Sequence, residues 1–61
     1  TSFIDYLNEY RLTMASRLLI SSDSSILDIA AEVGFDNLSY FNRVFKQKYS
    51  MTPRQFRKES Q

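Results

Sequence analysis

Arg43 and Asn42 carry the most specific chemistry in this sequence, because both side chains can match the hydrogen-bonding edges of DNA bases. A guanidinium can donate two hydrogen bonds to O6 and N7 of guanine, and a carboxamide can pair with N6 and N7 of adenine. Ser39 can bond several bases, and Leu38 can touch a thymine methyl group. On a helix these four residues and Lys46 share one face, at positions i, i+1, i+4, i+5 and i+8. Lys46 follows about one turn later, where a phosphate would lie.

The element that must carry these residues is an amphipathic helix predicted over residues 37–49. Phe41, Val44 and Phe45 form its apolar side. A shorter apolar helical pattern precedes it, and Gly34 separates the two as a left-handed stop. A glycine-punctuated helix pair that leaves polar and basic side chains free on its second helix is the usual way to place a helix in the DNA major groove.

Ala30 and Phe35 are expected to fix the angle between these two helices. Ala30 is small, which lets the second helix cross closely, and the ring of Phe35 fills the angle between them. Together with Gly34 they direct the polar face of residues 37–46 outward, and the major groove is wide enough to admit such a helix.

Each of these side chains also has an ordinary structural explanation. Arg43 and Lys46 could be solvated charges on a polar helix face, and Leu38 could be half-buried by Phe35. Tyr40 could pack beside its neighbours or offer its hydroxyl to a phosphate. The remaining aromatic stripe is expected in the core rather than in a stacking surface for single-stranded nucleic acid. Its members are Phe35, Phe41, Phe45, Tyr49 and Phe56.

A long first helix is predicted over residues 2–20. Ser2 can cap it, and Asp5 lies three residues on, near its positive end. Apolar residues at steps of three and four predict a buried stripe along this helix. The stripe comprises Phe3, Leu7, Tyr10, Met14 and Leu18, widened by Ile4, Leu12, Ala15 and Leu19.

The rest of the chain is also predicted to be helical. A helix-turn-helix unit is expected over residues 25–48, beginning at Ser25 as a cap. A short closing helix follows over residues 52–58, where Thr52 can cap and Pro53 suits the first helical position. The predicted fold is therefore all-α and homeodomain-like, with a long linker helix, a helix-turn-helix unit and a short C-terminal helix.

The composition excludes several classes of function. The chain of 61 residues has no cysteine and no histidine, which removes disulfides, thiolate sites and the commonest metal ligand and general base. No glycine-rich phosphate loop is present. No apolar run approaches the roughly 18 residues that a membrane span needs. We therefore expect no enzyme, no cofactor, no metal site and no membrane partner.

Charge is distributed unevenly along the chain, although the net charge is only +1. Residues 1–36 carry two basic and six acidic side chains, a net of −4, whereas residues 37–61 carry six basic side chains and one acidic, a net of +5. This asymmetry suggests an anionic partner for the second half, with a solvated basic tail as the alternative. The cluster of Arg54, Arg57 and Lys58 could touch DNA, but we favour a role in keeping this end soluble.

Taken in order, these residues resemble the DNA-binding domain of the AraC/XylS family of bacterial transcription regulators. The resemblance runs from about Phe3 to Lys58 and is far more specific than a general helix-turn-helix pattern. In the first helix it rests on Tyr6-Leu7, Arg11-Leu12, Ala15 and Leu18-Leu19. In the remainder it rests on Ile26, Ile29-Ala30, Val33-Gly34-Phe35, Ser39-Tyr40-Phe41, Arg43, Phe45-Lys46, Thr52-Pro53 and Phe56-Arg57.

The resemblance implies two helix-turn-helix units joined by a long helix, of which residues 1–61 hold the joining helix, the second unit and the closing helix. The first unit would precede residue 1. The resemblance places Leu38, Ser39, Asn42 and Arg43 near base edges. The expected phosphate contacts are Lys46, Ser25, Asn37 and Tyr40. Ser50 departs from the family, whose members usually have glycine there. Either a left-handed Ser50 costs about 1 kcal/mol, or the turn before the closing helix has a different shape.

Our leading hypothesis is sequence-specific binding of double-stranded DNA by a transcription regulator in the bacterial cytoplasm, associated with the nucleoid. RNA polymerase is a further candidate partner. The alternative hypothesis is a helical protein-interaction or dimerisation module that uses the 2–20 helix. That helix is expected to expose apolar surface and to favour self-association.

Overall fold

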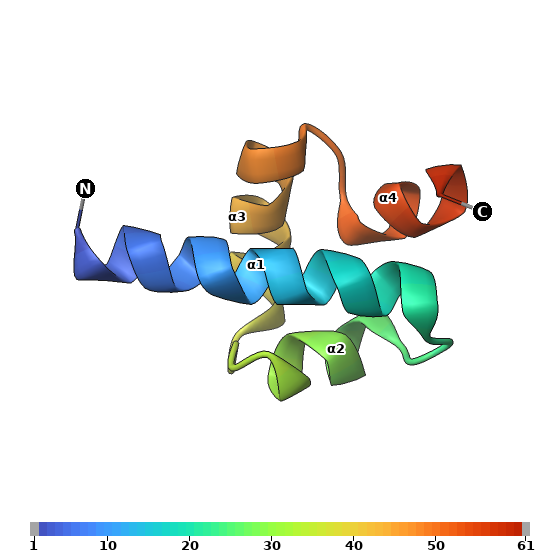
Figure 1. The fold of residues 1–61 in the computed structure, drawn as a ribbon, viewed down its shortest axis with the longest axis horizontal. Coiled ribbons are helices and arrows are strands. Elements are labelled where there is room, and N and C mark those ends of the chain that lie inside the picture. Colours follow the sequence, from blue (N-terminus) through green and yellow to red (C-terminus); the bar gives the residue numbers. More distant parts are fainter. Residues whose placement is uncertain (1, 61) are drawn as a thin grey trace.

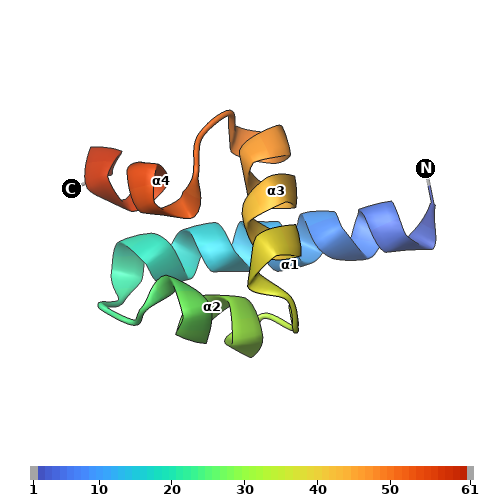
Figure 2. The ribbon, with the colours of Figure 1, turned by 180° about the vertical axis from the view of Figure 1, so that it is seen from behind.

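The computed structural model describes residues 2–60, so the outermost residues of the predicted 1–61 domain lie outside it. In this range the chain forms four helices and no strand, which confirms the all-α prediction. The helices are α1 (Phe3–Ser21), α2 (Ile26–Glu32), α3 (Leu38–Tyr49) and α4 (Pro53–Glu59). α1 runs the length of the molecule, α2 and α4 flank its C-terminal half, and α3 crosses it steeply (Figure 1). Seen from behind, α3 lies across the near side of α1 (Figure 2).

Each helix begins at a side chain that accepts a hydrogen bond from a backbone N–H group three residues later. The caps are Ser2, Ser25, Asn37 and Thr52, with distances of 2.9–3.2 Å. Thr52 forms a full capping box, because the Gln55 side chain also accepts from the Thr52 backbone N–H. Each cap stabilises its helix by about 1 kcal/mol, and Ser2, Ser25 and Thr52 match the sequence-based predictions.

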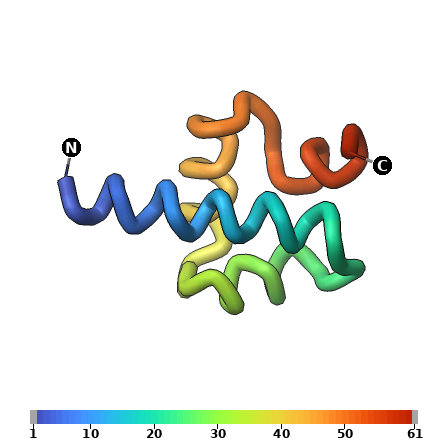
Figure 3. Tube along the Cα trace, viewed as in Figure 1, coloured from blue at the N-terminus to red at the C-terminus, as the bar shows by residue number. Residues whose placement is uncertain are grey.

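Helix α1 buries a narrower stripe than the sequence predicted. Only Leu12, Ala15 and Leu19 are buried on this helix, whereas Phe3 is 75% exposed and Tyr10 is 61% exposed. The reason is geometric, because the N-terminal end of α1 projects beyond the other three helices (Figure 3). The predicted stripe is therefore correct only in its C-terminal part.

The aromatic side chains of α3 and α4 form the centre of the core, as predicted. Phe41 and Phe45 are fully buried, with ring centroids 5.7 Å apart. Phe45 also contacts Tyr49 and Phe56, at 4.6 Å and 5.5 Å between centroids. Phe35 lies 5.1 Å from Phe41 and thus extends this cluster into the turn before α3. A ring cluster that links α3 to α4 and to the turn fixes the orientation of α3.

Two left-handed residues end α2 and α3. Gly34 has φ of 107° and lies just beyond α2, where the sequence predicted a glycine stop. Ser50 has φ of 63° and ψ of 17°, and its N–H group donates to the Lys46 carbonyl at 2.8 Å. The chain therefore keeps the left-handed turn after α3 without glycine, at a cost of about 1 kcal/mol.

Arg57 does not serve merely to keep the C-terminal end soluble, as the sequence suggested. Its Nε donates to the carbonyl oxygen of Leu19 at 3.0 Å, and its Nη2 donates to that of Ser22 at 3.1 Å. These carbonyls lie at the C-terminal end of α1, where the helix leaves acceptors without partners and has a partial negative charge. Arg57 thus joins α4 to the end of α1.

Replacing Arg57 by alanine is expected to lower the free energy of unfolding by about 1.5–3 kcal/mol, since two charged hydrogen bonds are lost. Urea denaturation would measure the change. Arg54→Ala is the control, because Arg54 lies exposed on the same helix and should cost less than about 0.5 kcal/mol. Equal losses for the two variants would contradict the role given to Arg57.

Candidate nucleic-acid interface

The face of α3 opposite the core is polar and basic. Phe41 and Phe45 are buried against the rest of the molecule, whereas Ser39, Arg43 and Lys46 are exposed. With about 100° of rotation per residue, these three side chains fall within an arc of roughly 60° on the side away from the buried rings. The structure therefore places the arginine at position 43 outward, as the sequence predicted.

The other two predicted base-reading residues lie at the edge of this face. Leu38 is 37% exposed and Asn42 is half-buried, because both are closer to the core side of the helix. Gln47 is exposed one turn after Arg43 and was not singled out from the sequence. Gln47 lies four residues after Arg43 and eight after Ser39, and this helical spacing could have identified it as part of the same face.

The predicted phosphate-contacting residues fall into three places, and Lys46 is exposed in the C-terminal half of α3. Asn37, Ser39, Tyr40 and Arg43 line one hollow at the start of α3, together with the carboxylate of Asp36. Ser25 is not part of this hollow. It caps the opposite end of α2, about 10 Å along the axis of that seven-residue helix.

Tyr40 links the long helix to the exposed face of α3. Its hydroxyl accepts a hydrogen bond from Nδ2 of Asn8 at 2.7 Å, and its ring lies 6.0 Å from that of Phe35. The guanidinium carbon of Arg43 lies 5.4 Å from the centre of the same ring. The sequence left Tyr40 open between packing and phosphate contact, and it is half-buried with its hydroxyl at the surface of α1.

Gly34 is favoured at the turn between α2 and α3 by its backbone conformation, because a φ of 107° disfavours any side chain. A Cβ atom built there would lie 2.9 Å from Nε of Arg11, which is the far end of a flexible side chain that passes close to the turn. The guanidinium of Arg11 also lies 5.8 Å from the centre of the Phe35 ring. The long helix therefore supports the turn directly, a contact that the sequence analysis did not identify.

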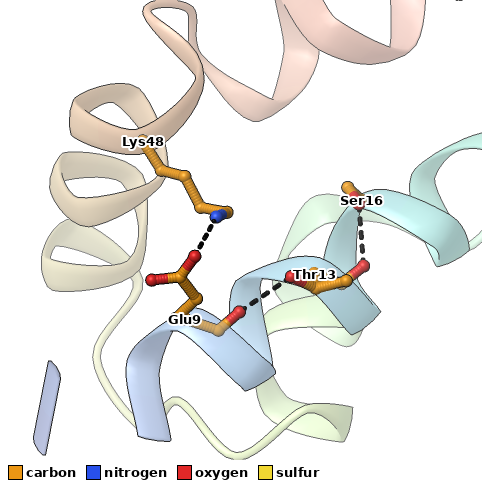
Figure 4. A network of polar contacts seen from close by, with 4 residues as sticks. All are labelled: Glu9, Thr13, Ser16 and Lys48. Carbon is orange, nitrogen blue, oxygen red and sulfur yellow. Dashed lines mark hydrogen bonds and ion pairs between the residues drawn. The ribbon is translucent and has the colours of Figure 1, made fainter. Parts of the chain in front are cut away.

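Lys48 is held by an ion pair with α1. Its Nζ lies 2.9 Å from Oε1 of Glu9, as Figure 4 shows. The hydrogen bond to Glu9 raises the pKa of Lys48 above its ordinary value of 10.5, so this side chain stays charged at neutral pH. Lys48 and Glu9 thus form a surface ion pair between α3 and the long helix, and the basic side chains of α3 without such a partner among residues 2–60 are Arg43 and Lys46.

Neither a metal-binding cluster nor a membrane-spanning helix is found among residues 2–60. Among residues 2–60 there is no group of three or more acidic, histidine or cysteine side chains placed to hold a metal ion. Within the same range no helix has the length and apolar character required to cross a bilayer.

Comparison with known proteins shows the family to which the chain belongs. The family profile described as a helix-turn-helix domain matches residues 1–59. The chain belongs to the AraC-type helix-turn-helix family. This family consists of DNA-binding domains of transcription regulators and is not a family of enzymes.

Individual relatives of this AraC-type domain are themselves regulators. The chain is 42% identical over 57 residues to the regulatory protein PocR of Salmonella typhimurium. The matched region covers 93% of this chain and 19% of PocR. It is 45% identical over 56 residues to the transcriptional activator RhaR of Yersinia pseudotuberculosis, covering 92% of this chain and 19% of RhaR. The chain thus spans about a fifth of the length of these relatives.

A solved structure has the same helical arrangement as this AraC-type domain. It is the crystal structure of the C-terminal domain of the two-component response regulator yesN from Fusobacterium nucleatum. The TM-score is 0.88 at 38% sequence identity, over 93% of this chain and 55% of the other.

Proposed function

We propose that this AraC-type domain binds double-stranded DNA sequence-specifically by placing α3 in the major groove. The single observation that carries the proposal is the exposed Arg43 on a helix whose opposite side is locked in the core by Phe41 and Phe45. A rigid helix that presents a guanidinium to solvent has the geometry required to read a guanine edge.

Four side chains of α3 are assigned to bases. Arg43 donates to guanine O6 and N7, and Ser39 bonds a neighbouring base. Leu38 and Asn42 lie at the edge of the exposed face, so they read the base pairs on one flank of the groove. In this assignment Arg43 contributes the strongest base preference, because it forms the bidentate contact.

Four side chains are assigned to phosphates. Lys46 provides the charge, since its ammonium is free of acidic partners among the described ion pairs. Ser25 and Asn37 each use one oxygen as a helix cap, which leaves the serine hydroxyl proton and the asparagine Nδ2 group free to donate. The hydroxyl of Tyr40 accepts from Asn8, so its own proton can be donated to a phosphate.

Binding-site selection from random duplexes tests this proposal. One reading helix predicts an enriched motif of about 5–6 base pairs, since half-sites recur every 10 or so base pairs when two helices read adjacent grooves. Selection at low salt is appropriate, because affinity falls steeply as phosphate contacts are screened. Recovery of unenriched duplexes would contradict sequence-specific reading.

Replacing Lys46 by alanine is expected to weaken binding by a similar factor on every DNA sequence. The slope of log K against log salt should fall by about one, because one phosphate contact is lost. Lys58→Ala is the matched control, since Lys58 is an exposed lysine on α4 away from the reading face. An unchanged salt slope for Lys46→Ala would contradict the phosphate role.

A DNA-bound regulator of this kind would act in the bacterial cytoplasm, on the nucleoid. There it lies within reach of RNA polymerase, which we propose as a further macromolecular partner without assigning it a surface.

Self-association through α1 is a second candidate function, favoured by the exposed apolar side chains of that helix. Phe3, Ile4, Tyr6 and Tyr10 are each more than half exposed. Exposed apolar patches commonly mark interaction sites.

We expect the weight-average mass to rise with protein concentration in sedimentation equilibrium. The double change Phe3→Ser and Tyr6→Ser should reduce that rise, because it removes two of the four apolar side chains. A single monomeric species at millimolar protein would rule out this candidate.

A further inference from the structure

We propose that Asn8, on the long helix α1, is a positioning residue for the base-reading Arg43 and that it acts through Tyr40. This inference rests on the proposed function of α3. It gives the long helix a direct part in base preference, because the chain of contacts begins on α1 and ends at the exposed guanidinium.

Tyr40 is held from three directions. Its backbone N–H donates to the Asn37 side chain at 2.9 Å, its ring lies against that of Phe35, and its hydroxyl receives the Asn8 hydrogen bond at 2.7 Å. The first two contacts are local to the turn and to α3. The third comes from 32 residues away in the sequence and fixes the outer end of the side chain.

Arg43 is exposed, and among residues 2–60 no acidic side chain forms an ion pair with it. Its guanidinium carbon lies 5.4 Å from the centre of the Tyr40 ring, within the range of a cation–π contact. A long, flexible side chain that must be ordered on binding reads its base better when it is already ordered in the free protein. Fixing the Tyr40 ring therefore pre-organises Arg43.

The direction of the Asn8 hydrogen bond has a second consequence. Because Nδ2 of Asn8 is the donor, the phenol oxygen acts as acceptor and keeps its own proton available. Within residues 2–60 the phenol donates to no protein acceptor. Asn8 thus leaves the Tyr40 hydroxyl free to donate to a phosphate beside the base that Arg43 reads.

The experiment compares Asn8→Ala with Thr13→Ala. Thr13 is also a neutral, half-buried residue of α1, but its hydroxyl bonds the Glu9 carbonyl of its own helix and does not reach α3 (Figure 4). Affinity is measured for the selected duplex and for a duplex changed at the base pair that Arg43 reads. We expect Asn8→Ala to reduce the discrimination between these duplexes by about 2- to 10-fold, and Thr13→Ala to leave it unchanged.

A double-mutant cycle and a DNA-free measurement complete the test. In a Tyr40→Phe background, where the hydroxyl is absent, Asn8→Ala should cause no further loss of discrimination. In the free protein, the NMR order parameter of the Arg43 Nε–H group should fall in Asn8→Ala and stay at the wild-type value in Thr13→Ala.

The outcomes separate this inference from the proposed function. Equal weakening on both duplexes by Asn8→Ala, or an unchanged Arg43 order parameter, would overturn the positioning role. Absence of any sequence preference in the wild-type protein would instead reject the proposed function. In that case the order parameter of the free protein would still decide whether Asn8 orders Arg43.

Discussion

Phe45→Ala is expected to remove about 3–5 kcal/mol from the free energy of unfolding, the largest effect of any single change considered for this protein. Phe45 is fully buried and its ring contacts those of Phe41, Tyr49 and Phe56. Its loss would leave a cavity where α3 meets α4. A chain of 61 residues has a total stability of roughly 3–9 kcal/mol, so most of that stability would be lost.

Phe3→Ala provides a matched control for this prediction. The chemical change is the same, but Phe3 is 75% exposed at the start of α1 and should cost less than about 0.5 kcal/mol. Urea or thermal unfolding followed by circular dichroism at low protein concentration would measure both variants. If Phe45→Ala unfolded at the same urea concentration as Phe3→Ala, the aromatic cluster would not be the centre of the stabilising core.

Arg43→Ala is expected to weaken binding to the selected DNA site by about 1–3 kcal/mol and to relax the preference at one base pair. The physical reason is the loss of two hydrogen bonds to a guanine edge, which no other side chain near Arg43 can replace. Repeating the site selection with the variant would measure both effects. The information at one position of the motif should disappear, while the remaining positions keep their preference.

Arg54→Ala is the matched control for the loss of a positive charge. Arg54 is exposed on α4, and its removal should leave the selected motif unchanged. Uniform weakening of Arg43→Ala on all sequences, with the motif intact, would assign Arg43 to a phosphate rather than to a base. That result would leave DNA binding in place but would contradict the reading role.

The helices of this fold could be predicted from the sequence because their signals are local. The predicted 2–20 helix is found at Phe3–Ser21, and the predicted 37–49 helix is found at Leu38–Tyr49 with Asn37 as its cap. A cap depends on residues three apart, and a glycine stop depends on one backbone conformation. Both signals lie in a short stretch of sequence, whereas the left-handed conformation of Ser50 was left open, because a serine does not require it.

Contacts between distant helices could not be predicted in the same way. The hydrogen bonds of Asn8 with Tyr40, Glu9 with Lys48 and Arg57 with Leu19 join residues 32, 39 and 38 positions apart. They depend on where α1 crosses α3 and where α4 returns to the end of α1. Helical periodicity specifies which side of each helix is apolar, but not which length of that side another helix covers.

The exposed face of α3 was predictable in its centre and less so at its edges. Arg43 and Lys46 lie on the opposite side of the helix from Phe41 and Phe45, so the helical period of 3.6 residues alone places them outward. Leu38 and Asn42 lie near the boundary of the apolar side, where exposure depends on neighbouring elements. Asn42 is accordingly half-buried, whereas Gln47 is exposed.

The most direct test of the central claim is an NMR titration of the labelled protein with a duplex that contains the selected motif. We expect the largest chemical-shift changes on Ser39, Arg43 and Lys46 of α3, and we expect a duplex altered at the Arg43 base pair to remove the change at Arg43. Changes concentrated on the exposed side of α1, around Phe3 and Tyr6, with α3 unaffected, would contradict the central claim.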